Sequence, residues 1–263
     1  MEFFTIFVAS LMTLISPTGT VADQVAQRTI RSQFAEVEAL QVRIDNAPVH
    51  QFLQGRVDRI RIAGKGLFPL KEIRIDELQI ETDPIDVDFR RKGRVKLARP
   101  LNVASRVVLT EADLNRALAS PTVTNWLRQV GSRVVVGDRN ARRAQRFQFL
   151  TPKVQFQGDR LRFQISLQEA DDPARLDISV ETGLAVDNGR QFRLVNPQVW
   201  VNGDPVSKEV VETLTNGLPE RTNLQKLEKS GILARVLRLQ IQPGKLQLET
   251  FAQVQSLDFR NKD

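Results

Sequence analysis

The sequence predicts an α+β fold that is rich in β-strands, and three features of the chain indicate it. Apolar and polar residues alternate along many segments, as in Leu161–Leu167, and this period of two is typical of strands with one buried face. Turn sequences such as Asp187-Asn188-Gly189 separate these segments, and an Asn-Gly pair favours a tight hairpin. Helical periodicity is confined to short stretches. With 263 residues, 41% of them hydrophobic, the chain is long enough to bury a sizeable core.

The N-terminal segment resembles a targeting signal. Residues 3–15 form an uncharged, mostly apolar run that is followed by small residues, as in a secretory leader. The run is shorter than the roughly 20 apolar residues that a membrane-spanning helix needs. Glu2 and the lack of Lys or Arg before the run depart from the leader pattern, so an N-terminal helix packed on the domain is the alternative. We expect residues 1–22 to be a signal peptide or membrane anchor.

Residues 23–263 are expected to form a single domain, because neither a linker nor a shift in composition divides them. An amphipathic helix is predicted to about Glu36 from apolar residues at helical spacing, namely Val21, Val25, Ala26, Ile30 and Phe34. Period-two strands follow from Leu40. Gly64-Lys65-Gly66 is expected to be a turn. In the next strand the apolar residues change from odd to even positions, and a bulge near residues 76–77 would bring all of them to one face.

The clearest helix start lies in the middle of the chain. Thr110 precedes Leu114 and Leu118 and has an acid, Asp113, three positions later, which is the pattern of an N-terminal capping box. Short helices are also expected over residues 120–130, 206–218 and 224–229. Residues 128–146 hold many arginines and little apolar periodicity, so we expect a basic loop there.

The composition argues against an enzyme, a metal site and a cofactor. The chain has no Cys and one His, His50, so thiol chemistry and most histidine chemistry are excluded. Asp83, Asp86 and Asp88 lack the glycine and the closing glutamate of a calcium loop. Gly64-Lys65-Gly66 lacks the third glycine of a dinucleotide-binding loop. No nucleophile elbow or zinc-protease motif occurs.

The net charge of +7 favours an anionic partner. Two basic segments can dock on an anionic membrane surface at about 1 kcal/mol per residue, through Arg90, Arg91, Lys92, Arg94, Arg139, Arg142, Arg143 and Arg146. A nucleic-acid partner is less well supported, because the segments lack the interleaved aromatics that stack on bases. A solvated loop is the remaining alternative.

The alternating strands give each sheet one apolar and one charged face. If the sheet bends strongly, its apolar faces line an interior, which is either a solid core or a groove that holds acyl chains. The sequence leaves both open. The groove hypothesis rests on the few large aromatics and on helices that can close an open end. It selects as lipid contacts Ile60, Ile62, Val87, Phe89, Phe163, Ile165, Leu237 and Leu239.

Three runs in the first half carry a family resemblance: LQGRVDRIRIAGKGLF from Leu53, IRIDELQIETDPIDVD from Ile73 and VVLTEADLNRALASP from Val107. With the order of elements around them, they resemble the LmeA-like family of bacterial phospholipid-binding proteins. The resemblance implies a strongly curved, barrel-like antiparallel sheet wrapped around a long amphipathic helix, as in tubular lipid-binding folds. It also implies phospholipid or a related glycolipid as partner.

The function expected from both arguments is the binding, or carrying, of phospholipid in an apolar groove at the bacterial cell envelope. The protein is then exported or membrane-associated, on the periplasmic side. A solid-cored envelope scaffold that binds proteins is the alternative, and a basic nucleic-acid-binding module is a third. The sequence makes no prediction of oligomeric state.

Overall fold

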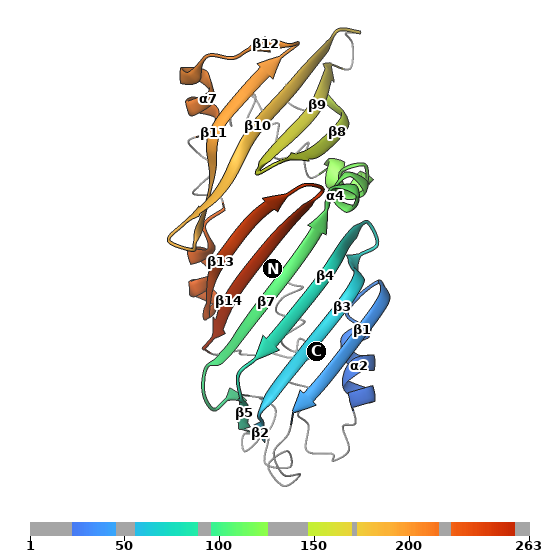
Figure 1. The fold of residues 1–263 in the computed structure, drawn as a ribbon, viewed down its shortest axis with the longest axis vertical. Helices are drawn as coiled ribbons and strands as arrows, with labels where there is room; N and C mark the ends of the chain where they lie inside the picture. Colours follow the sequence, from blue (N-terminus) through green and yellow to red (C-terminus); the bar gives the residue numbers. More distant parts are fainter. Residues whose placement is uncertain are drawn as a thin grey trace. The chain divides into compact units, whose positions relative to one another are not determined.

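The structure, a computed structural model, describes residues 23–45, 56–88, 96–125, 147–169, 173–215 and 222–255. Antiparallel strands dominate it, and the helices are few and short (Figure 1). The chain divides into two compact units, which are treated separately below. The first comprises Met1–Val108, Leu224–Arg238 and Leu248–Asp263, and the second comprises Leu109–Asn223 and Leu239–Gln247.

The first unit is built on a six-stranded antiparallel sheet in the order β1-β3-β4-β7-β14-β13, of which β7, β13 and β14 contribute residues to both units. The strands are β1 (Glu36–Asp45), β3 (Arg59–Leu70), β4 (Ile73–Thr82), β7 (Leu101–Thr110), β13 (Ile232–Gln242) and β14 (Lys245–Val254). A small sheet joins β2 (Arg56–Val57), β5 (Ile85–Asp88) and β6 (Lys96–Leu97). The unit also holds the helix α2 (Asp23–Arg31) and the 3₁₀ helix η2 (Leu224–Ser230).

The core of the first unit lies on the face of the sheet that α2 covers. Alternate residues of β1 and β3 point into it, and Ile60, Leu67 and Val254 have no exposed side-chain surface at all. Ile30 of α2 is equally buried in the same cluster. This core is therefore a solid one, in which side chains pack on side chains.

The expected turn at Gly64-Lys65-Gly66 is wrong, because these residues lie inside β3. Gly66 has a φ of +55°, and the pairing of β3 with β4 shifts between Leu67 and Leu70, so the glycines accompany an irregularity within the strand. At Gly64, a Cβ would come within 2.7 Å of Leu67 Cδ1. The irregularity expected in β4 near residues 76–77 therefore falls in its partner strand, and β4 runs unbroken.

The second unit contains a five-stranded antiparallel sheet in the order β12-β11-β10-β9-β8. Its strands are β8 (Phe147–Gln157), β9 (Arg160–Glu169), β10 (Arg175–Asp187), β11 (Gln191–Val201) and β12 (Asp204–Pro205). Positive φ at Asn188 and Gly189 forms the predicted hairpin between β10 and β11. The helices are α4 (Glu111–Leu118) and α7 (Lys208–Thr215). The predicted cap of α4 is confirmed, since Thr110 Oγ1 accepts from the N–H of Asp113 at 3.1 Å.

The predicted fold class is confirmed in its coarse form and corrected in its detail. The sheets of the described residues are open: β1 and β13 end one, and β8 and β12 end the other, so no barrel closes. Nor do the described residues include a long helix inside a curved sheet. The helix predicted to reach Glu36 ends at Arg31, because the N–H of Ala35 donates to the carbonyl of Phe68 at 2.8 Å and the backbone joins β1.

Candidate functional site

One face of the five-stranded sheet is a half-buried apolar surface. The strand register aligns Val154, Phe163, Val180 and Val199 across β8, β9, β10 and β11. Because side chains two residues apart share a face, neighbouring rows extend the same surface. We call this the second apolar face, and its members are Phe149, Val154, Phe156, Leu161, Phe163, Ile165, Leu167, Leu176, Ile178, Val180, Leu184, Val186, Phe192, Leu194, Val199 and Val201.

Most of the second apolar face is only half-buried. Val154, Phe156, Ile165 and Leu167 are buried, Leu176 is 37% exposed, and the rest are intermediate. The first unit differs, because the side chains of its core cluster are sealed from solvent. The second unit therefore keeps apolar area within reach of an amphipathic ligand.

The helix α4 covers one end of this face. Leu114 and Leu118 pack with Val154 and Phe156 in the second unit's apolar cluster. Polar groups of the same helix bond the free edge of β8. Asn115 Nδ2 donates to the carbonyl of Val154 at 2.8 Å, and Asn115 Oδ1 accepts from the N–H of Val154 at 2.7 Å. Glu111 Oε2 accepts from the N–H of Phe156 at 2.8 Å. The helix thus fixes the edge strand. Ile241 and Leu246 join the same cluster, which also includes Leu161, Phe163 and Leu184, and the remaining members of the face stay mostly half-buried.

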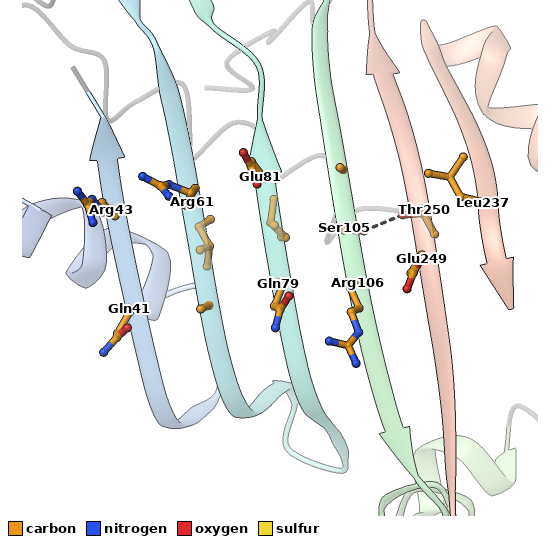
Figure 2. Close-up of a pocket in the computed structure, with 14 residues that line it drawn as sticks. Gln41, Arg43, Arg61, Gln79, Glu81, Ser105, Arg106, Leu237, Glu249 and Thr250 are labelled. Carbon is orange, nitrogen blue, oxygen red and sulfur yellow. Dashed lines mark hydrogen bonds between the residues drawn. The ribbon is translucent and has the colours of Figure 1, made fainter. Parts of the chain in front are cut away.

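The six-stranded sheet carries an open groove of about 500 Å³ on its polar face (Figure 2). The groove runs across the strands between two rows of side chains, one with Arg43, Arg61 and Glu81 and the other with Gln41, Gln79 and Arg106. The intervening row includes Ile62, whose side chain belongs to the core. The lining therefore mixes charged and amide groups with the apolar side chains of Ala63, Ile80, Ala104 and Leu237.

Three charged side chains of this first groove form ion pairs with residues beside it. Arg43 Nε lies 3.1 Å from Asp45 Oδ1, and Arg61 Nη2 bonds the other oxygen of the same carboxylate. Glu81 pairs with Arg59 at 2.9 Å. Arg43, Arg61 and Glu81 are therefore already paired with opposite charges.

The comparison with known families identifies the family of the chain. The model of the LmeA-like phospholipid-binding family matches residues 14–251. The chain belongs to this family. No curated protein and no solved structure matches the chain. The family match spans both units of this LmeA-like protein, so the second apolar face lies within the matched region.

Two of the lipid contacts predicted for this LmeA-like protein lie on the second apolar face, Phe163 and Ile165. Ile60 and Ile62 instead lie in the solid core of the first unit, at 0% and 2% exposure. Both side chains pack in the core beneath α2.

The remaining predicted contacts are scattered. Leu237 is 66% exposed and borders the first groove (Figure 2), and Leu239 follows it in β13, half-buried. Val87 lies in β5, where it pairs with Leu97, and Phe89 lies outside the described residues. Their role as lipid contacts stays a prediction. The sequence-based choice missed the β10 and β11 members of the apolar face, although the same alternation marks them.

The predicted membrane-surface residues lie outside the described residues. They are Arg90, Arg91, Lys92, Arg94, Arg139, Arg142, Arg143 and Arg146. The leader over residues 1–22 lies outside them as well. In the ranges that the structure covers, no helix has the length and hydropathy of a membrane span, and no group of acidic or His residues is arranged to hold a metal.

Proposed function

We propose that this LmeA-like protein binds phospholipid and that the acyl chains lie on the second apolar face. The observation that supports the proposal is a wide apolar sheet surface whose side chains are mostly half-buried. Burying one methylene group is worth about 0.8 kcal/mol, so a few methylenes laid along the row of Val180 and Val199 give a useful affinity. We propose binding and not catalysis, in line with the family description.

The location that we propose is the cell envelope, with the protein exported or held at a membrane surface. The apolar run at residues 3–15 supports this, and so does the net charge of +7, which favours anionic lipid head groups. Phospholipid is the proposed partner, and glycolipid is a related candidate because its acyl chains have the same chemistry.

A pair of substitutions on one strand tests the site. Val199→Asp places a carboxylate on the second apolar face, whereas Gln198→Asp places the same carboxylate one residue earlier, at an exposed position of the opposite face. If the charge displaces two or three methylenes, the affinity for a phosphatidylglycerol with a fluorescent acyl chain falls roughly ten- to fiftyfold in the first variant only.

The wild-type chain provides the first measurement. Phospholipid extracted from the protein after gentle purification, and quantified by mass spectrometry, is expected in a fixed ratio to protein. Far-UV circular dichroism of both variants checks that the sheet is retained. Equal affinities of the two variants would contradict the site. A chain that is consistently empty of lipid would instead favour a protein-binding scaffold.

A further inference from the structure

The polar face of the second unit's sheet carries a groove that the acyl-chain proposal does not use. It has a volume of about 620 Å³ and crosses β8, β9, β10 and β11. The register aligns Lys153, Gln164, Ser179 and Trp200 in one row of its lining. Ser166 and Asp177 form the next row on the same face. We call it the Trp200 groove.

The Trp200 groove and the second apolar face are opposite sides of one sheet. Ile165 and Ile178 lie between the two polar rows, and their side chains point to the apolar face. Trp200 stands between Val199 and Val201, so the alternation places its indole on the polar side. A half-buried tryptophan is unusual on the polar face of a strand, where polar side chains are expected.

The guanidinium of Arg162 is held in place in this groove. It lies over the Trp200 ring, 6.0 Å from the ring centroid, and Arg162 Nε donates to Ser179 Oγ at 3.3 Å. Both contacts orient the side chain without neutralising its charge. Its remaining N–H groups have no protein partner within the described residues, and a planar guanidinium offers them as a fork that matches phosphate oxygens.

A second cation lines the same groove. Lys153 is exposed and makes no hydrogen bond or ion pair with the part of the chain that the structure describes. It lies on the strand next to Arg162, one row away on the same face. The acid of the groove, Asp177, is engaged by Ser166, whose hydroxyl donates to Asp177 Oδ1 at 2.6 Å. Asp177 keeps its negative charge, but within the described residues it forms no ion pair with Arg162 or Lys153, so the two cations outnumber the one acid of the groove.

The first groove shows the opposite arrangement. There Asp45 contacts both Arg43 and Arg61, so these two cations already have an anion. Of the two grooves, the Trp200 groove alone combines an oriented guanidinium and an ammonium that lack a carboxylate contact in the described structure. This difference selects it as an anion site.

We propose that the Trp200 groove binds a phosphate-bearing ligand, with Arg162 and Lys153 on the phosphate oxygens and Ser179, Gln164 and Trp200 against the organic group that carries it. The phosphate belongs either to a lipid head group or to a small soluble phosphate ester. The site goes beyond the proposed lipid function and does not require it, because a soluble phosphate ester has no acyl chain.

Calorimetric titration of the full chain with glycerol 3-phosphate tests the proposal, with glycerol as the probe that lacks phosphate, at 0.15 M ionic strength. Arg162→Gln is expected to weaken binding of glycerol 3-phosphate at least about tenfold, since hydrogen bonds to charged groups are the strong ones. Lys153→Gln changes an exposed residue and provides a second variant that leaves packing intact. Arg193→Gln is the matched control, because it removes the same charge from the same sheet outside the groove, where Arg193 pairs with Asp187 at 3.0 Å.

Vesicles distinguish the two sources of phosphate. Cosedimentation with phosphatidylglycerol and phosphatidylcholine mixed at about 30:70 is compared with cosedimentation with phosphatidylcholine alone. Loss of the phosphatidylglycerol preference in Arg162→Gln, but not in Arg193→Gln, assigns a lipid head group. Binding of glycerol 3-phosphate without that vesicle effect assigns a soluble ester. The proposal is overturned if neither probe binds, or if Arg193→Gln weakens binding as much as Arg162→Gln. Neither result bears on acyl binding at Val199.

Discussion

The side chain of Asn115 is expected to contribute more to the stability of the second unit than any exposed ion pair on α4. Asn115→Ala removes both hydrogen bonds to the backbone of Val154, at 2.7 and 2.8 Å, and leaves that N–H and carbonyl without their partner. Val154 is 7% exposed, so its backbone is poorly placed to bond water instead. Val154 also anchors the first row of the second apolar face.

The magnitude follows from the two orphaned groups. Leaving a buried polar group unsatisfied costs about 1–3 kcal/mol, and β8 is an edge strand to which water has partial access once the amide is gone. We therefore take the lower part of the range for each group and expect a loss of about 2–3 kcal/mol. In a chain of this size, that lowers the unfolding midpoint by roughly 4–10 °C.

Urea unfolding measures the loss, with Arg116→Ala as the control on the same helix. Arg116 is 59% exposed and pairs with Asp113 at 3.3 Å, so its removal costs less than about 1 kcal/mol. Hydrogen exchange gives a local readout: the amide of Val154 exchanges faster in Asn115→Ala, while the amides of β10 do not. The reasoning fails if the two variants are equally stable, or if exchange at Val154 is unchanged.

Two further predictions concern the backbone conformation of a glycine and the charge of a carboxyl group. Gly66→Ala is expected to lower the free energy of unfolding by about 1–2 kcal/mol because Gly66 has a left-handed φ of +55°. The loss is expected to be larger still because the new Cβ would clash with the side chain of Glu38. Gly158→Ala, at a φ of +64° in open space, measures the cost of the backbone conformation alone in the same urea assay. The pKa of Glu209 is lowered by its own backbone N–H and then by the Ser207 hydroxyl. Its contribution to stability is therefore present at neutral pH and lost as pH falls through the lowered pKa. Ser207→Ala should raise this pKa part of the way to its usual value, as a carbon-13 NMR titration of the carboxyl would show; no rise would refute the role of the hydroxyl.

The local elements of the fold were predictable because short-range chemistry determines them. The cap of α4 needs only a hydroxyl at Thr110 and an acid at Asp113, three residues apart. The hairpin at Asn188-Gly189 needs two positive φ values, which those residues accept most readily. The glycines at 64 and 66 led to a wrong prediction of a turn, because glycine also occurs at irregularities within strands. Only the pairing with the neighbouring strand distinguishes a turn from such an irregularity.

The candidate sites were less predictable because they depend on register and on what packs above a face. Alternation marks Ile60 and Phe163 as apolar-facing in the same way, yet α2 and its neighbours seal the first, and the second stays half-buried. Arg162 and Trp200 lie on different strands, β9 and β11, and the pairing through β10 brings them together. The spacing of Arg162 and Trp200 in the sequence does not reveal which strands pair.

The two units differ in how they use the same alternating pattern. In the first, α2 and the sheet bury side chains such as Ile30, Leu67 and Val254, so burial of that face stabilises the fold itself. In the second, much of the apolar face is still half-buried, and the area left over is available to stabilise a complex. A ligand that binds only the folded chain adds its binding energy to folding stability. The second unit therefore gains the more from lipid, and the lipid-binding role that we propose is best sought there and not in the better-packed first unit.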